Sequence, residues 1–236
     1  MSIFSVVTDV VKGIGNAIVG TVSVVAGLLG DIFSRFVGIP GFILDLIGFR
    51  IKKKLRLKLI ILTDGVTQLI PQENLNETFK LTKRILKEQA NIELIQTGTL
   101  IAGGAPDGAL NVTSPAASFF ELWGEVGAYF NALAGVGVFT RRLSVIIVRT
   151  MEHDNGRSFG PTANFVLVEK QYFDNPKNQA TIVAHEIGHA CGLGIPLDLP
   201  HRKQKENLMY KPDERGEILS SWQSSVIRGS RFVWYF

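Results

Sequence analysis

Apolar residues from position 55 onward follow a two-residue period in some segments and a helical period in others. This difference predicts the secondary structure. Leu55, Leu57 and Leu59 alternate with charged residues and run into Ile60-Ile61-Leu62, which predicts a strand that ends at Asp64-Gly65. Three further strands are predicted at residues 92–97, 144–149 and 164–169.

The segments between these strands carry apolar residues at helical spacing. Pro71 suits a first helical turn, and the apolar residues after it predict a helix up to Ala90. Residues 119–133 have a similar apolar face, and Asn175-Pro176 supplies an N-cap and a first-turn proline for a helix that ends near Leu193. Polar, glycine-containing loops are predicted at residues 103–115 and 151–161. Strands that alternate with helices predict an α/β fold.

Residues 1–50 differ from the rest because they are rich in Gly, Val, Ile and Phe and poor in charge. Their longest uncharged run, residues 13–30, is near the lower length limit for a membrane-spanning helix, and five of its residues are glycine. Apolar residues also recur at steps of three and four, which predicts an amphipathic helix. The segment therefore suits a membrane span, an interfacial helix, an oligomer seam or a helical layer packed on its own domain.

The positive charge of the chain is concentrated in one short stretch. The formal net charge is +4. Residues 51–58 carry five positive charges, residues 1–50 sum to zero and residues 59–236 sum to −1. We therefore predict no nucleic-acid partner. A basic cluster beside an apolar segment suits an anionic membrane surface, which would be reached through residues 1–58. The alternative is a solvated strand start that keeps a sheet edge soluble.

The N-terminus lacks a cluster of positive charge and a clean cleavage site after the apolar run, so a cleavable signal peptide is not expected. Membrane association is the favoured location. Cys191 is the only cysteine, which excludes an intrachain disulfide and fits a reducing compartment.

The strongest chemical signal is a pair of histidines with a glutamate between them. His185 and His189 are four residues apart, so on a helix both rings lie on one face and can reach one zinc ion. Glu186 would lie beside the metal and take a proton from water that zinc binds. This arrangement predicts zinc-assisted hydrolysis of a peptide carbonyl.

The residues around this pair suit a buried active-site helix. Ile182 and Ile187 supply apolar sides. Gly188 would let a neighbouring element approach closely, and Gly192 suits a helix end with positive φ.

The stretch HEIGHACG, from His185 to Gly192, resembles the metzincin clan of zinc endopeptidases, whose pattern is H-E-x-x-H-x-x-G-x-x-H followed by a Met-turn. Asn207–Tyr210 resembles the Met-turn, a tight turn whose methionine lies under the metal. Gly216–Phe232 resembles the C-terminal helix behind the site. The resemblance implies a twisted mixed sheet with an active-site helix and a C-terminal helix. It also implies a zinc cofactor, Glu186 as the catalytic residue, and a peptide substrate that pairs with an edge strand at residues 164–169.

The third zinc ligand departs from the family pattern, which places a histidine where this chain has Ile195. A histidine appears later, at His201, eight residues before Met209. This spacing is similar to that of the matrix-metalloprotease-like branch. We therefore predict His185, His189 and His201 as the zinc ligands, with an insertion before His201.

Two alternatives for the third ligand stay open. Asp198 is one, since a carboxylate also binds zinc. The other is a glutamate on a downstream helix, as in thermolysin-like enzymes, for which the candidates are Glu206, Glu214 and Glu217. His153 is expected to be a loop residue, and Cys191 a small core residue.

The sequence therefore predicts a zinc-dependent metalloendopeptidase. Residues 51–236 would form the catalytic domain, and residues 1–50 an apolar N-terminal segment associated with a membrane. The alternative is a non-catalytic membrane-associated or protein-interaction module that retains a zinc site. Glu186 favours the enzyme, because a purely structural zinc site does not need a glutamate in this position.

Overall fold

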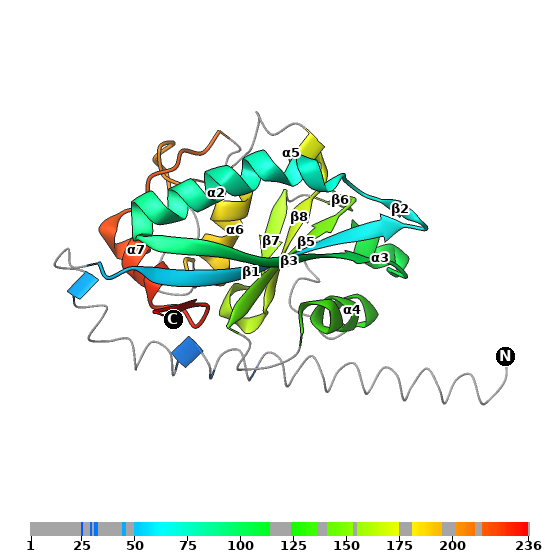
Figure 1. Ribbon diagram of the computed structural model, residues 1–236, viewed down its shortest axis with the longest axis horizontal. Coiled ribbons are helices and arrows are strands. Elements are labelled where there is room, and N and C mark those ends of the chain that lie inside the picture. The colour runs from blue at the N-terminus through cyan, green and yellow to red at the C-terminus, as the bar shows by residue number, and fades with distance from the viewer. Residues whose placement is uncertain are drawn as a thin grey trace.

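A mixed β-sheet lies at the centre of the computed structural model (Figure 1). The structure describes residues 25, 29, 31–32, 44–45, 50–113, 124–135, 141–152, 155–174, 181–194, 202–210 and 214–235. Within these residues the main sheet contains β1 (Lys53–Asp64), β2 (Thr67–Gln68), β3 (Ile92–Ala102), β5 (Arg142–Val148), β7 (Gly156–Ser158), β8 (Phe165–Glu169) and β9 (Val233–Trp234). A separate parallel pair is formed by β4 (Asn111–Val112) and β6 (Thr150–Met151).

The central strands follow the order β3-β1-β5-β8-β7. The pairs β1–β3, β1–β5 and β5–β8 are parallel, whereas β7 runs antiparallel to β8. The short strands β2 and β9 pair antiparallel with the two ends of β1. Parallel strands covered on both faces are expected to be continuously apolar, and all five residues of β8 are buried.

Helices cover both faces of this sheet. They are α2 (Leu75–Ala90), α3 (Asp107–Leu110), α4 (Glu125–Ala134), α5 (Gln171–Asp174), α6 (Ile182–Ala190) and α7 (Ser221–Arg228), with short 3-10 turns η1 (Gln72–Asn74) and η3 (Gly160–Thr162). Leu55, Leu57 and Leu59 of β1 face a core shared with α2, α6 and α7. Ile60 and Leu62 face a second core shared with α3 and α4. In Figure 1, α2 and α4 accordingly lie on opposite sides of the sheet.

The strands predicted near residues 55, 92, 144 and 164 and the helix that ends at Ala90 are confirmed. Three expectations are wrong. The predicted loop 103–115 contains α3 and β4, which are too short to show a period. The predicted loop 151–161 contains β7, whose three residues are too few to show a period. Residues 164–169 do not form an edge strand, because β8 pairs with β5 on one side and β7 on the other. The outer strand on this side of the sheet, among the described residues, is β7.

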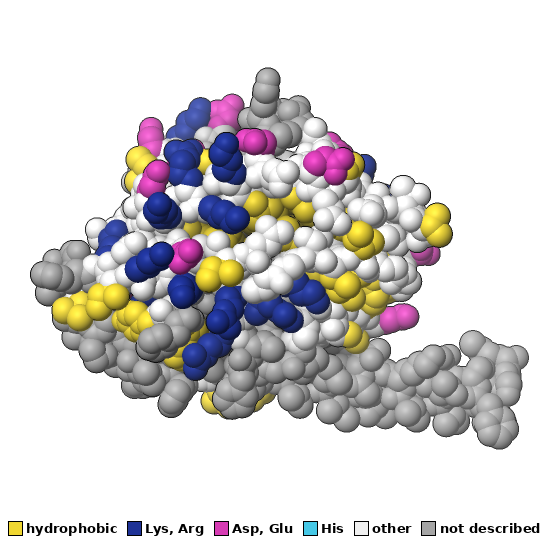
Figure 2. Space-filling model, in the orientation of Figure 1, with side chains coloured by type: hydrophobic (Ala, Val, Ile, Leu, Met, Phe, Trp, Pro, Cys, Tyr) yellow, Lys and Arg dark blue, Asp and Glu magenta, His cyan; other side chains and the backbone are white. Residues whose placement is uncertain are grey.

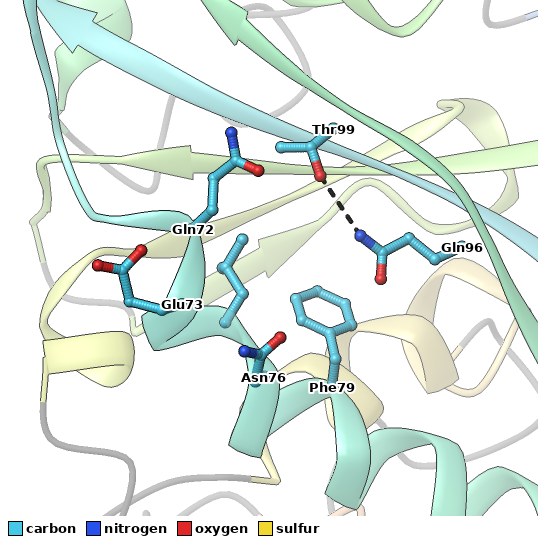
Figure 3. A pocket seen from close by; sticks show the side chains of 7 residues that line it. Gln72, Glu73, Asn76, Phe79, Gln96 and Thr99 are labelled. Carbon is cyan, nitrogen blue, oxygen red and sulfur yellow. Dashed lines mark hydrogen bonds between the residues drawn. The ribbon is translucent and has the colours of Figure 1, made fainter.

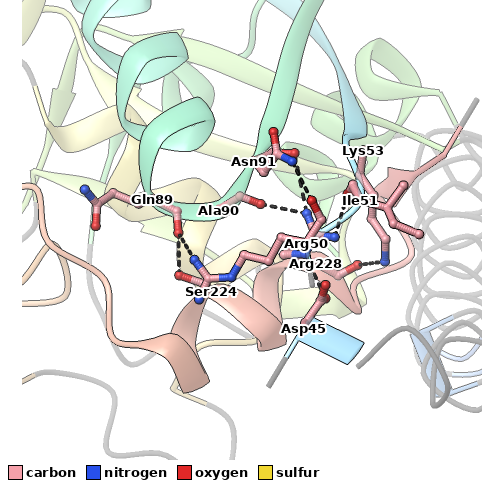
Figure 4. Close-up of polar contacts among 9 residues, drawn as sticks. All are labelled: Asp45, Arg50, Ile51, Lys53, Gln89, Ala90, Asn91, Ser224 and Arg228. Atoms are coloured by element: carbon pink, nitrogen blue, oxygen red, sulfur yellow. Dashed lines mark hydrogen bonds and ion pairs between the residues drawn. The ribbon is translucent and has the colours of Figure 1, made fainter. Parts of the chain in front are cut away.

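Most of residues 1–50 lie outside the described residues, but Asp45 is placed and is buried (Figure 4). Its Oδ2 atom lies 2.7 Å from Nε of Arg228, a residue of α7 that is only 1% exposed. The Arg228 guanidinium also donates to the backbone oxygens of Ala90 and Ile51, each at 2.7 Å. This network ties the N-terminal segment to α7, to the end of α2 and to the residues just before β1. No helix in the described part of the chain has the length and apolar character that crossing a bilayer requires.

Candidate metal centre

The two histidines predicted to bind zinc lie on α6, a helix that is buried along almost its whole length. Ile182, Val183 and Ile187 hold α6 in the first core, because their apolar side chains face α2 and the sheet. His185 and Glu186 are buried, whereas His189 is partly exposed. The helix therefore presents its polar face at the boundary between the core and solvent.

The imidazole rings of His185 and His189 converge on one point. Their Nε2 atoms lie 3.2 Å apart. The ring planes are nearly perpendicular, with an angle of 89° and a centroid distance of 4.6 Å. Two nitrogens bound to one tetrahedral zinc at about 2.0–2.1 Å lie about 3.3–3.4 Å apart. The two rings therefore have the separation that a shared zinc ion requires.

Backbone carbonyls orient both rings through hydrogen bonds at Nδ1, the nitrogen that faces away from the other histidine. His185 Nδ1 lies 2.7 Å from the oxygen of Leu208, and His189 Nδ1 lies 2.9 Å from the oxygen of Leu193. A carbonyl oxygen only accepts, so each Nδ1 carries the proton and donates it. The lone pair of each ring is then on Nε2, the atom that faces the other histidine. This second layer of hydrogen bonds is typical of histidines that bind metals.

The carboxylate of Glu186 is held against an edge strand. Its Oε1 atom lies 4.0 Å from Nε2 of His185, and the residue is 4% exposed. Gly156 of β7 leaves the room for it, because a Cβ atom at residue 156 would lie 2.7 Å from Cγ and 2.8 Å from Oε1 of Glu186. The absence of a side chain at residue 156 thus determines where this carboxylate can lie.

The chain turns sharply at the end of α6, as the sequence predicted. Gly192 has φ of 102° and Gly194 has φ of 94°, a region that strains other residues. The turn is closed by hydrogen bonds from the nitrogen of Gly192 to the oxygen of His189 and from the nitrogen of Leu193 to the oxygen of Gly188. It brings the oxygen of Leu193 back to His189. Cys191 in this turn is buried in the core, as expected.

A second tight turn, Asn207–Tyr210, packs against α6. The nitrogen of Met209 donates to Oδ1 of Asn207 at 2.9 Å, and the nitrogen of Tyr210 donates to the oxygen of Asn207 at 3.0 Å. The amides of Asn207 and Gln223 exchange two hydrogen bonds, at 2.9 and 3.1 Å, which fix the turn to α7. Met209 is buried, and a Cβ atom at Gly188 would lie 2.8 Å from its sulfur. The close approach predicted at Gly188 is therefore confirmed.

Other residues that the sequence nominated fall outside this arrangement. His201, Asp198 and His153 lie outside the described residues. The thermolysin-like alternative needs a glutamate on a second helix. None of its candidates lies on a helix, because Glu206, Glu214 and Glu217 all belong to the irregular segment before α7.

Two of those glutamates already have partners. Glu214 pairs with Lys205, and Glu217 lies 2.8 Å from Nη2 of Arg84. Within the described part of the chain, no group of three or more His, Cys, Asp or Glu side chains is placed to hold a metal ion. The described part of the candidate site is therefore the pair of histidines on α6 together with Glu186.

Sequence inspection missed several residues that shape the site: Gly156, Leu193, Leu208 and Gln223. Leu193 and Leu208 act through backbone oxygens, which no side-chain pattern reveals. Gln223 had a signal, since Ser220 and Gln223 form a capping box at the start of α7. The same glutamine side chain both closes that cap and reaches Asn207.

A pocket of about 190 Å³ opens between the start of α2 and β3 (Figure 3). Its lining is largely polar and includes Gln72, Glu73 and Gln96, and the side chain of Gln96 donates to Thr99 at 3.3 Å. None of the residues that line it belongs to α6. It is therefore a feature separate from the histidine pair.

No protein-family model matches the chain, and no curated protein matches it in sequence. Several solved structures are similar. Mirolysin in complex with compound 9 has a TM-score of 0.51 at 13% identity, over 75% of this chain and 91% of mirolysin. Mirolysin is a metallopeptidase. The chain has a metallopeptidase-like fold.

Two further structures have lower scores. Metalloproteinase-II from Bacteroides fragilis has a TM-score of 0.46 at 14% identity, over 75% of this chain and 53% of that protein. A structure described as a chaperone-substrate complex has a TM-score of 0.46 at 11% identity, over 76% of this chain and 34% of that one. At these identities the likeness concerns the fold.

Proposed function

We propose that this chain is a zinc-dependent metalloendopeptidase of the metzincin type, in which His185, His189 and His201 bind zinc and Glu186 is the catalytic residue. The observation that carries the proposal is the 3.2 Å separation of the two Nε2 atoms, with each Nδ1 bonded to a backbone oxygen. Two lone pairs that face each other at this distance suit a shared cation. The metallopeptidase-like fold supports the same conclusion.

The anchoring of the next residue supports His201 as the third ligand. The nitrogen of Arg202 donates to the oxygen of Met209 at 2.8 Å. Met209 in turn packs against Gly188 of the histidine helix. The chain is therefore fixed beside the site one residue after His201. Asp198 remains the rival ligand, and substitution separates the two.

Glu186 is the group on this chain that moves a proton. A bound zinc ion would polarise the scissile carbonyl and lower the pKa of the attacking water. The Glu186 carboxylate accepts a proton from that water and then donates it to the leaving amine. Burial of Glu186 and the close approach of Gly156 restrict the positions that its carboxylate can take. Such restriction favours catalysis because the reacting groups are already oriented.

The position of β7 suggests where a substrate binds. β8 pairs with β5 along its length and with β7 at Val166–Val168, so a peptide cannot add to the middle of β8. β7 is the outer strand and packs against Glu186 through Gly156. We therefore place an extended peptide along the outer edge of β7, where main-chain hydrogen bonds would hold it beside the carboxylate.

Hydrolysis of casein by the full chain tests the proposal, with zinc content measured on the same samples. We expect activity that a chelator removes and added zinc restores. Glu186→Gln should lower kcat by at least about 100-fold while zinc stays bound, since general acid–base catalysis contributes about 10²–10⁴-fold. His201→Ala should lose zinc, whereas His153→Ala, which removes the remaining histidine, should keep it.

Three results would contradict parts of this proposal. Loss of zinc in Asp198→Ala with retention in His201→Ala would assign the third ligand to Asp198. Equal hydrolysis by Glu186→Gln and the wild type would remove Glu186 from the mechanism. Stoichiometric zinc without hydrolysis of any peptide library would favour the rival function, a non-catalytic interaction module with a zinc site.

A further inference from the structure

The placed acidic residues of the N-terminal segment point into the protein. Asp31 and Asp45 have helical backbone and are 5% and 3% exposed. Asp45 forms the buried ion pair with Arg228 described above (Figure 4). Asp31 lies near Arg231, where burial lowers the pKa of the guanidinium to about 10 and the Asp31 charge opposes that shift. The two carboxylates thus face buried arginines of the C-terminal region.

The placed apolar residues of the same segment point outward. Val25, Leu29, Ile32 and Leu44 are between 40% and 60% exposed. Positions i, i+4 and i+7 share one face of a helix, so helical backbone directs Val25, Leu29 and Ile32 to the same side. A helix that packs on its own domain normally buries its apolar face and exposes its charges. Here the described residues show the reverse.

Basic side chains lie along the first half of β1 and at the start of β5. Lys54, Arg56 and Lys58 occupy alternate positions of β1, on the face opposite Leu55 and Leu57, and none of the three is buried. Arg142 of β5 pairs in register with Arg56 and is also partly exposed. Figure 2 shows a row of Lys and Arg side chains across the molecule.

The docking points of the N-terminal segment are close to these cations. Because β1, β5 and β8 are parallel, their first residues lie at the same end of the sheet. Arg228 donates to Ile51, just before β1, and Arg231 donates to Asn164, just before β8, at 2.6 Å. The ion pair of Asp45 with Arg228 therefore attaches the segment at the end of the sheet where β1 and β5 begin, close to Lys54 and Arg142.

We propose that this end of the molecule binds the surface of an anionic lipid bilayer, with Val25, Leu29, Ile32 and Leu44 in the interface and Lys54, Arg56 and Arg142 against the headgroups. Charge favours this occupant over a second copy of the chain. A twofold interface would place the same basic residues of two copies opposite each other, and like charges repel. An anionic bilayer instead receives apolar side chains and attracts the cations.

Co-sedimentation of the full chain with vesicles tests the proposal. The vesicles contain phosphatidylcholine alone or phosphatidylcholine with phosphatidylserine. We expect binding to the anionic vesicles, weakened by added salt because exposed charges are screened. Leu29→Ser with Ile32→Ser should reduce binding at least about tenfold, since two apolar side chains leave the interface. Val66→Ser is the matched apolar control, because Val66 is almost fully exposed in the turn between β1 and β2.

A second pair of variants tests the charges independently. Lys54→Gln with Arg56→Gln should weaken binding by roughly tenfold or more, since each basic side chain near an anionic surface contributes about fivefold. Lys80→Gln with Lys83→Gln removes two exposed cations from α2, on the other face of the sheet, and should leave binding unchanged. Matched thermal unfolding of all variants verifies that they fold.

Several outcomes would overturn the proposal. These are no binding to either vesicle, equal binding to both, or equal losses in the test and control variants. A wild-type dimer in sedimentation experiments that Leu29→Ser with Ile32→Ser converts to monomer, without lipid binding, would identify a second copy as the occupant.

Discussion

Met209 lies directly against Gly188, so close that a methyl group at residue 188 would come within 2.8 Å of its sulfur. The residue before Met209 accepts the hydrogen bond from His185. The glycine therefore sets the distance between the histidine helix and the turn that orients its first ring.

We predict that Gly188→Ala loosens this contact. In a helix, alanine in place of glycine would normally gain about 0.5–1 kcal/mol. Here the clash with Met209 should reverse the sign and destabilise the protein by about 1–3 kcal/mol, the usual cost of overpacking. Zinc affinity should also fall, because Leu208 shifts with Met209. Urea unfolding and zinc titration measure the two effects.

The matched control for Gly188→Ala is Gly229→Ala, at the end of α7, where an added Cβ would meet its nearest atom at an ordinary 3.5 Å. The double variant Gly188→Ala with Met209→Ala should lose less stability than the sum of the two single variants, since the sulfur that clashes with residue 188 is gone. Additive losses in the double variant would show that the two residues do not interact.

Gly156→Ala should impair catalysis more than folding. The added methyl group would lie 2.7 Å from Cγ of Glu186 and displace its carboxylate. A misplacement of about 1 Å in a reacting group costs about 100-fold in rate, so we expect kcat to fall by about that factor. Zinc content should stay at the wild-type level, because His185 and His189 keep their backbone partners. Unchanged kcat would show that β7 does not position Glu186.

Asp45→Asn should destabilise the protein strongly. It leaves the charge of Arg228 buried without its carboxylate partner, which typically costs about 3–5 kcal/mol. Asp45→Leu combined with Arg228→Met should cost much less, because neither charge is then buried alone. The exposed pair of Glu217 with Arg84 provides the control, and Glu217→Ala should cost at most about 1 kcal/mol. Denaturant unfolding of the full chain measures all three, and similar losses for Asp45→Asn and Glu217→Ala would contradict the prediction.

Lys53 should make the stability depend on pH in the alkaline range. Burial, and next the charge of Arg228, lower the pKa of Lys53 from 10.5 to about 8. Below pH 8 the amine is charged in both states, and the folded state carries the full cost of that buried charge. Between about pH 8 and 10.5 the folded state releases the proton while the unfolded state keeps it, so stability rises with pH. The gain is at most about 3.5 kcal/mol, since the difference of about 2.5 pH units contributes about 1.4 kcal/mol per unit.

The contribution of Lys53 is isolated by comparison with Lys53→Met, since other groups also titrate above pH 8. The difference in unfolding free energy between wild type and Lys53→Met should change in favour of the wild type as the pH rises through this window. A difference that stays constant from pH 7 to about pH 10 would show that Lys53 titrates at its ordinary pKa.

The sequence by itself determined the longer local elements and the position of both histidines on one side of α6. Alternating leucines specify β1 because side chains of a strand point to opposite faces in turn. The spacing of His185 and His189 places both rings on one side of a helix, and Gly192 marks its end because positive φ strains other residues. These features depend only on neighbours along the chain, so they could be predicted from it.

Tertiary structure decided what surrounds those elements. β7 was missed because three residues show no period, and its position beside β8 and Glu186 depends on pairing between distant segments. The partners of the two rings are backbone oxygens of Leu193 and Leu208, which every residue type possesses. The sequence also could not show that Asp45 turns inward to Arg228, 183 positions later in the chain, while Leu44 beside it faces outward. A charge is buried only where the fold supplies a countercharge, and that match depends on contacts far apart in sequence.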